Sequence, residues 1–232
     1  LGGAPNWRKD LPAFQTWCRN RTRQGKYWVP FAKGGEYSPY YSDIHLVVNW
    51  KNEGEEIKQF VCQQYPYLKG NASYVVKNTD YYFRPGVTWP RSTIKGLNAR
   101  PLPACCIFAD KGPVAFSLAD TFLEETLWNL LVLMNSAFFQ NAIYLQNGSR
   151  AWEVGLIQNA PFGNWTETQL TILREICNDI VQEIIYILEH DETTLLAKTL
   201  FQKQPNDANI ILSLGDFIAK NSLSIETLIC QG

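Results

Sequence analysis

The sequence predicts an α+β fold in which an irregular, mostly antiparallel β-rich lobe is followed by helices, one of them long and amphipathic. Three observations lead to this prediction. Apolar residues make up 46% of the 232 residues and charged residues 19%, a composition that supports a buried core. Short apolar and aromatic runs alternate with Gly and Pro turns up to about residue 116. Beyond it, the apolar spacing becomes helical.

The first half of the chain predicts strands. Its apolar–aromatic runs are separated by turn signals such as Gly34-Gly35 and Pro85-Gly86, and they cover residues 44–50, 81–83, 87–89, 105–109 and 114–116. Short runs of this kind are typical of antiparallel β structure. We therefore expect a β-rich region over 1–116.

Helical spacing begins near residue 118. Apolar residues recur at every third or fourth position from Leu118 to Met134, with Asp120 or Thr121 as the N-cap. Asn135-Ser136 interrupts the pattern. A second short helix is expected over 137–145.

The clearest predicted helix covers residues 166–190. Thr166 and Gln169 have capping-box spacing, and an apolar stripe of more than 20 residues follows them. This helix either packs against the rest of the protein or acts as a spacer, and its acidic face favours packing. Residues 152–157 are expected to be extended, and weaker helices are expected over 192–201 and 210–229.

These elements suggest two units. Residues 1–162 form one domain, β-rich over 1–116 and helical over 117–162, and residues 163–232 form a helical spacer or docking segment. The sequence begins with Leu1 rather than Met, and we expect it to be part of a longer protein.

Charge is distributed unevenly along the chain. Residues 1–116 contain 16 Lys and Arg against 8 Asp and Glu, whereas residues 117–232 contain 5 against 14. A basic half predicts a polyanionic partner such as nucleic acid. The sequence shows neither a signal peptide nor an apolar run that would span a membrane, and no C-x-x-C pair is present. We expect a cytoplasmic protein with reduced thiols, no metal site and no membrane contact.

Motifs for catalysis are missing. The sequence contains no G-x-G turn for a cofactor, no P-loop and no H-E-x-x-H zinc motif. The segment Asn159-Ala160-Pro161-Phe162 approaches the Asn-Pro-Pro-aromatic loop of adenine methyltransferases, but Ala160 replaces the first Pro. We interpret it as a turn, and we expect this chain to hold no catalytic residue and no cofactor of its own.

Several motifs occur in an order that resembles a known family. They are WVPFAKGGEY at 28–37, VVNW at 47–50, NEGEEIK at 52–58, KNTDYYFRPGVTW at 77–89, NARPLP at 98–103, CIFADKGP at 106–113, LVLMNSAFF at 131–139 and VGLIQNAP at 154–161. Over about residues 26–190 the chain resembles the C-terminal target recognition domain of BREX phage-defence adenine methyltransferases and of Type IIG restriction–modification enzymes. The last motif also resembles the end of target recognition domains in Type I specificity subunits.

The resemblance implies a module that reads duplex DNA for a larger enzyme. The parent would be an S-adenosylmethionine-dependent adenine-N6 DNA methyltransferase, with or without endonuclease activity. The cofactor would bind a catalytic domain of the same polypeptide, outside this chain, and this module would position the target adenine.

Duplex recognition needs phosphate anchors and groups that read base edges. The basic, turn-rich segment 84–100 offers both kinds of side chain, and the loops near residues 33 and 111 add lysines. The candidate DNA-binding residues are Lys33, Arg84, Thr88, Arg91, Ser92, Lys95, Asn98, Arg100 and Lys111.

Two other functions remain open at this point. One is a protein-interaction module of a phage-defence complex that makes no base contacts. The other is a self-contained hydrolase or nuclease, since nuclease carboxylates have loose spacing.

Overall fold

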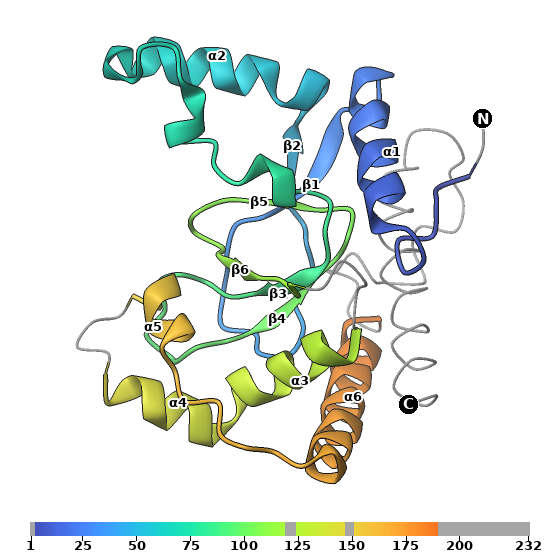
Figure 1. Ribbon diagram of the computed structural model, residues 1–232, viewed down its shortest axis with the longest axis vertical. Coiled ribbons are helices and arrows are strands. Elements are labelled where there is room, and N and C mark those ends of the chain that lie inside the picture. Colours follow the sequence, from blue (N-terminus) through green and yellow to red (C-terminus); the bar gives the residue numbers. More distant parts are fainter. Residues whose placement is uncertain (1–2, 119–123, 147–150, 190–232) are drawn as a thin grey trace.

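A computed structural model describes residues 3–118, 124–146 and 151–189 of the chain. Two small sheets lie between helices at both ends of the molecule (Figure 1). The α+β class that the sequence predicts is therefore confirmed.

The strands are short and form two three-stranded sheets. They are β1 (Trp28–Ala32), β2 (Val47–Asn49), β3 (Gly86–Thr88), β4 (Arg100–Leu102), β5 (Ile107–Phe108) and β6 (Val114–Ala115). The sheet orders are β2-β1-β5 and β4-β3-β6. Among the described pairings only β1–β5 is parallel, as expected for a mostly antiparallel lobe.

Four of the five predicted runs overlap a strand, the run 81–83 does not, and β1 and β4 lie outside the predicted runs. It follows a 3-10 turn at Thr79–Tyr81, and Phe83 has a positive φ of 62°. Tyr82 and Phe83 are both buried. These apolar side chains are therefore buried in a turn. A short apolar run in the sequence looks the same whether it forms a buried turn or a strand.

The first half also contains a helix that the strand pattern did not predict, α1 (Leu11–Arg23). Its N-cap is Asp10, whose side chain accepts a hydrogen bond from the Ala13 amide at 2.9 Å. Phe14 and Cys18 are buried on one face. The Asp cap and this spacing are signals that identify the helix in retrospect.

A second unexpected helix, α2 (Glu55–Gln64), begins a projecting segment that we call the α2 arm, residues 55–81. The arm continues through short 3-10 turns and lies at the top left of Figure 1. Gly54 precedes α2 with φ 78°, and a Cβ there would collide with the ring of Trp50. Only Val61 is buried within α2, so this helix lies largely at the surface.

Three helices follow the sheets: α3 (Glu124–Asn135), α4 (Ala137–Tyr144) and α5 (Val154–Gln158). The predicted break at Asn135-Ser136 is confirmed, because the Ser136 hydroxyl caps α4 through the Phe139 amide at 3.2 Å. Residues 154–158 are helical, so the prediction of an extended run over 152–157 is wrong. The proposed N-cap at Asp120 or Thr121 lies outside the described residues.

The long predicted helix is confirmed as α6 (Glu167–Glu189). The capping box is present: the Thr166 amide donates to Gln169 Oε1 at 2.9 Å, and the Gln169 amide donates to Thr166 Oγ1 at 3.3 Å. Val181 and Ile185 of α6 belong to the same apolar core as residues of the sheets and of α3, against which α6 packs (Figure 1). The helices predicted over 192–201 and 210–229 lie outside the described residues.

Candidate nucleic-acid interface

Three loops meet beside the sheets, at residues 33–37, 90–96 and 109–113. A Cβ at Gly34 would lie 2.8 Å from the Lys111 carbonyl oxygen, and a Cβ at Gly112 would lie 2.9 Å from the Gly34 nitrogen. The backbones of the first and third loops therefore lie close together at Gly34 and at Gly112, and Gly34 also has a φ of 82°. Glycine is therefore required there for the first and third loops to touch.

The middle loop is fixed by hydrogen bonds on both sides. The Arg91 amide donates to the Lys111 carbonyl at 3.0 Å, and the Arg91 carbonyl accepts from the Trp152 amide at 2.7 Å. The indole of Trp89 donates to the Trp152 carbonyl at 2.9 Å, beneath the loop. These bonds hold residues 89–92 between the third loop and the chain just before α5.

Four candidate DNA-binding residues are exposed on these loops: Lys33, Ser92, Lys95 and Lys111. We call the surface that they share the three-loop surface. Lys95 Nζ lies 5.9 Å from the ring centroid of Tyr37, which links the first and second loops. Within the described residues none of the three lysines forms an ion pair, so their charges are available to a ligand.

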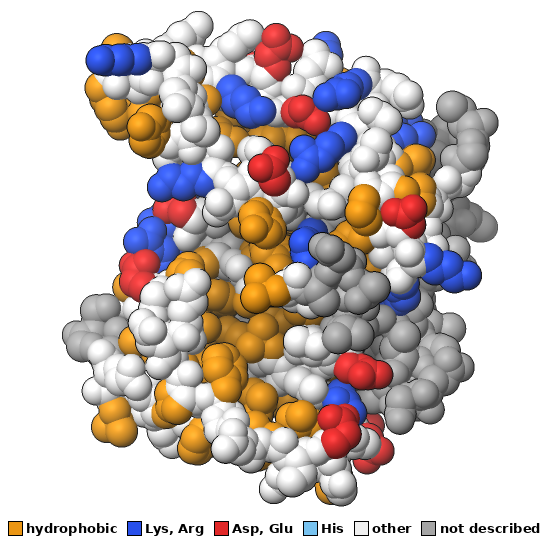
Figure 2. All heavy atoms as spheres, viewed as in Figure 1, with side chains coloured by type: hydrophobic (Ala, Val, Ile, Leu, Met, Phe, Trp, Pro, Cys, Tyr) orange, Lys and Arg blue, Asp and Glu red, His pale blue; other side chains and the backbone are white. Residues whose placement is uncertain are grey.

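Arg91, the fifth candidate on this surface, already has anionic partners. Its guanidinium pairs with Glu153 at 2.8 Å and with Asp110 at 3.2 Å. The hydrogen bonds and charge of Glu153, and then Asp110, raise the pKa of Arg91. Basic and acidic side chains alternate at the indented margin between α2 and α5 (Figure 2). The surface charge is therefore mixed and less positive than the sequence count suggested.

Three other candidates are buried. The Thr88 hydroxyl donates to the Pro113 carbonyl at 3.0 Å, and the Arg100 guanidinium donates to the Glu36 carbonyl at 3.4 Å. Burial lowers the pKa of Arg100. The Asn98 side chain is fully buried, and its amide has no hydrogen-bond partner among the described residues. All three side chains are buried in this structure, and their assignment to DNA stays a prediction.

Arg84 also turns inward. Its guanidinium donates to the Ser117 carbonyl and lies 5.8 Å from the ring centroid of Phe116. Its side chain is half-buried and supports the end of β6. The structure thus brings Lys33, Arg91, Ser92, Lys95 and Lys111 together on three adjoining loops, buries Thr88, Asn98 and Arg100, and turns Arg84 toward Phe116 and Ser117.

Cysteine thiols and clusters of metal ligands are two common sources of catalytic chemistry. The five described cysteines are free thiols, and burial raises the pKa of Cys177 to about 12, so it stays protonated at neutral pH. No group of three metal-ligating side chains occurs within the part of the chain that the structure describes. None of the described helices is both long and apolar enough to span a bilayer.

Sequence reasoning passed over the exposed aromatic side chains of the α2 arm. Tyr65, Tyr67 and Tyr74 all lie at the surface there. The signal was visible in the sequence, since residues 57–79 contain three Lys and no Asp or Glu among these tyrosines.

Comparison with known proteins places these features in context. No protein-family model matches the chain. The chain is 27% identical over 156 residues to the adenine-specific methyltransferase PglX of Lacticaseibacillus casei (strain Zhang), and 29% identical over 111 residues to the adenine-specific methyltransferase BrxX of Escherichia coli O9:H4 (strain HS). The matches cover 67% and 48% of this chain but only 12% and 8% of those relatives. The chain is therefore similar to a small part of two adenine-specific methyltransferases.

Proposed function

We propose that this chain is the duplex-DNA recognition module of an adenine-specific DNA methyltransferase. It would position a target adenine for N6 methylation by a catalytic domain elsewhere in the polypeptide, where S-adenosylmethionine would bind. The observation that carries the proposal is the similarity to two adenine-specific methyltransferases over about a tenth of their length, in a stretch that contains no G-x-G cofactor turn.

The three-loop surface supports a phosphate-contacting role. Lys33, Lys95 and Lys111 extend from loops whose backbones are fixed by glycine contacts and hydrogen bonds. Fixed loops lose little conformational freedom on binding, and lysines serve well as phosphate contacts. Arg91 would bind DNA only by exchanging its carboxylate partners for phosphate or guanine, so the lysines carry more of the proposed contact.

The salt dependence of duplex binding tests this proposal. Counterion release makes the logarithm of affinity fall with the logarithm of salt concentration, by about 0.9 for each neutralised phosphate. We expect each of the variants Lys33→Ala, Lys95→Ala and Lys111→Ala to reduce the slope of log affinity against log salt concentration by about 1. Fluorescence anisotropy between roughly 50 and 200 mM salt measures this slope.

Lys9→Ala is the matched control, because Lys9 is an exposed lysine just before α1 and belongs to none of the three loops. Its salt slope should equal that of the unmodified chain. Affinity that does not change with salt, or slopes that fall equally in all four variants, would count against the three-loop surface as the DNA contact.

A protein-interaction module is the second candidate function. It is favoured by Ile172, Ile176 and Ile187 of α6, which are half or more exposed although α6 otherwise packs on α3. In the first proposal this face would dock on the catalytic domain. In the alternative it would bind another subunit of a phage-defence complex, and the chain would show no salt-dependent affinity for DNA.

A further inference from the structure

Residues 57–79 of the α2 arm differ in charge from the three-loop surface. Residues 57–79 include Lys58, Lys69 and Lys77 and contain no Asp or Glu. Lys69 and Lys77 are exposed, and none of the three lysines forms an ion pair within the described residues. The acidic residues that flank this stretch are Glu55 and Glu56 on one side and Asp80 on the other. The middle of the arm, residues 57–79, therefore offers positive charge to a polyanion, and the carboxylates of the arm lie at its two ends.

The same stretch exposes large aromatic rings. Phe60 is 59% exposed, Tyr67 74% and Tyr74 66%. Tyr65 lies beside Tyr67, with ring centroids 5.8 Å apart and planes tilted by 59°. Exposed rings interleaved with lysines are typical of surfaces that bind single-stranded nucleic acid, because bases stack on the rings while the lysines contact the phosphates.

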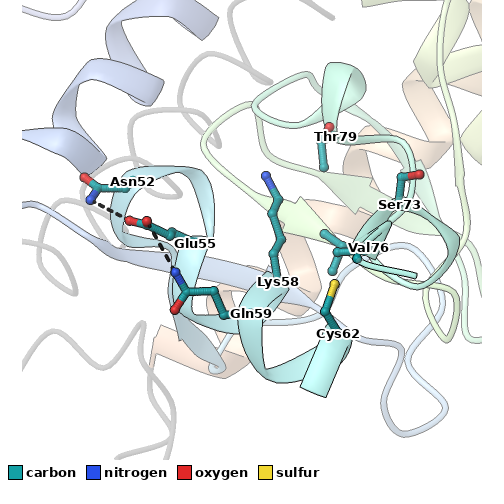
Figure 3. Close-up of a pocket in the computed structure, with 10 residues that line it drawn as sticks. Asn52, Glu55, Lys58, Gln59, Cys62, Ser73, Val76 and Thr79 are labelled. Carbon is teal, nitrogen blue, oxygen red and sulfur yellow. Dashed lines mark hydrogen bonds between the residues drawn. The ribbon is translucent and has the colours of Figure 1, made fainter. Parts of the chain in front are cut away.

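A groove runs along the inner side of the arm, between α2 and residues 70–79. Its volume is about 660 Å³, within the range of sites that hold small molecules. Lys58 extends from α2 into this space, toward the side lined by Ser73 and Thr79 (Figure 3). Lys58 Nζ also lies 5.6 Å from the ring centroid of Trp50.

The one carboxylate in the groove is already engaged. Glu55 accepts hydrogen bonds from Asn52 at 3.1 Å and from Gln59 at 3.4 Å, at the end of the groove away from Thr79 (Figure 3). Amide donors offset part of its negative charge. The charge in the remainder of the groove is that of Lys58.

We propose that the α2 arm binds unpaired nucleotides of a DNA strand, with bases stacked on Tyr67 and Tyr74 and the phosphate backbone near Lys58, Lys69 and Lys77. The choice of DNA rests on the proposed function, whereas the preference for unpaired nucleotides rests on the exposed rings. An enzyme that modifies a base must take it out of the stack, so a contact of this kind would favour DNA that is locally open.

The test compares two labelled duplexes of equal length, one fully paired and one with a run of mismatches at its centre. Fluorescence anisotropy with the 232-residue chain should show tighter binding to the mismatched duplex. The double variant Tyr67→Ala/Tyr74→Ala should reduce this preference by at least about fivefold, the lower end of the effect of removing a stacking ring.

Two controls separate stacking from loss of structure. Tyr67→Phe/Tyr74→Phe keeps both rings and should keep the preference, since stacking does not need the hydroxyl. Tyr144→Ala removes a ring that is 72% exposed on α4 and should leave the preference unchanged. Circular dichroism and the unfolding midpoint of each variant check that it folds.

The outcomes distinguish this inference from the proposed function. If the chain binds the paired duplex in a salt-dependent way but shows no preference for mismatches, or if the alanine double variant keeps that preference, the arm proposal is wrong and the recognition proposal stands. If no duplex is bound, the recognition proposal fails, and binding of a single-stranded oligonucleotide then decides the arm proposal by itself.

Discussion

Residues 84–100 and the α2 arm differ in how far their aromatic side chains, and some of their basic ones, are buried. Trp89 is 1% exposed and Arg100 3% exposed, although the motif around them looks like a binding segment. Tyr67 in the arm is 74% exposed, and Lys69 beside it is exposed as well. Both regions combine aromatic and basic side chains in a turn-rich sequence, yet Trp89 and Arg100 lie in the interior, whereas Tyr67 and Lys69 face solvent.

The difference follows from what surrounds each region. Residues 84–100 contain β3 and end at the first residue of β4, and these strands lie in the middle of the molecule with β6 and α3 packed against β3 (Figure 1). The arm contacts the rest of the protein at its end, where Arg19 of α1 donates to the Thr79 carbonyl at 3.0 Å and the Tyr81 ring stacks on Phe116 with centroids 5.4 Å apart. In residues 84–100 the buried Trp89 and Arg100 therefore serve packing, and exposure is confined to the loop at 90–96 that carries Ser92 and Lys95. In the arm, exposed tyrosines and lysines occur along most of the stretch 57–79.

Removal of Trp89 should cause the largest effect. Trp89→Ala deletes a fully buried ring and its hydrogen bond to the Trp152 carbonyl, so we expect a loss of about 3–5 kcal/mol in unfolding free energy. Urea unfolding followed by circular dichroism measures it. A loss below about 1 kcal/mol would mean that the interior around β3 is not packed as described.

A pair of glycine substitutions compares the two regions directly. Gly70 in the arm and Gly34 in the first loop have φ values of 80° and 82°, but only Gly34 has backbone within reach of an added Cβ. Gly70→Ala should cost about 1–2 kcal/mol from the positive φ alone. Gly34→Ala should cost at least about 1 kcal/mol more, because the collision with Lys111 adds to it. Equal losses in urea unfolding would contradict the contact between the first and third loops.

Asn135 tests how α3 is attached to the sheet. Its side chain accepts from the Ala99 amide at 3.0 Å and donates to the Ala99 carbonyl at 2.8 Å. Asn135→Ala leaves the Ala99 amide unpaired, whereas the Ala99 carbonyl keeps its hydrogen bond from the Tyr40 amide at 2.9 Å. We expect a loss of about 1–3 kcal/mol in unfolding free energy from the one unpaired buried amide. Asn159→Ala is the matched control, since that amide donates only to Gly155 at an exposed site. It should cost less than about 0.5 kcal/mol.

Tyr67→Ala should have the smallest effect on stability. Because its ring is mostly exposed, we expect a change within about 0.5 kcal/mol, measured by the same urea unfolding. A loss as large as that of Trp89→Ala would show that the arm is buried against another part of the protein, which would remove the contrast between the two regions.

The sequence by itself determined the elements that depend on local signals. The capping box at Thr166 and the apolar stripe after it specify α6, and Ser136 specifies the break between α3 and α4. Hydrogen bonds within one turn and a helical period are properties of neighbouring residues, so they can be recognised without the fold. The cap at Asp10 is of the same kind, and α1 was within reach of sequence reasoning.

Only the tertiary structure decided which candidate residues face solvent. Thr88, Asn98 and Arg100 have side chains suited to DNA, but the pairing of β3 with β4 and β6 turns them inward. Lys33 and Lys111 are 78 positions apart in sequence and become neighbours because Gly34 and Gly112 let two backbones touch. Burial and proximity depend on contacts between distant segments, and residue type alone does not encode these contacts.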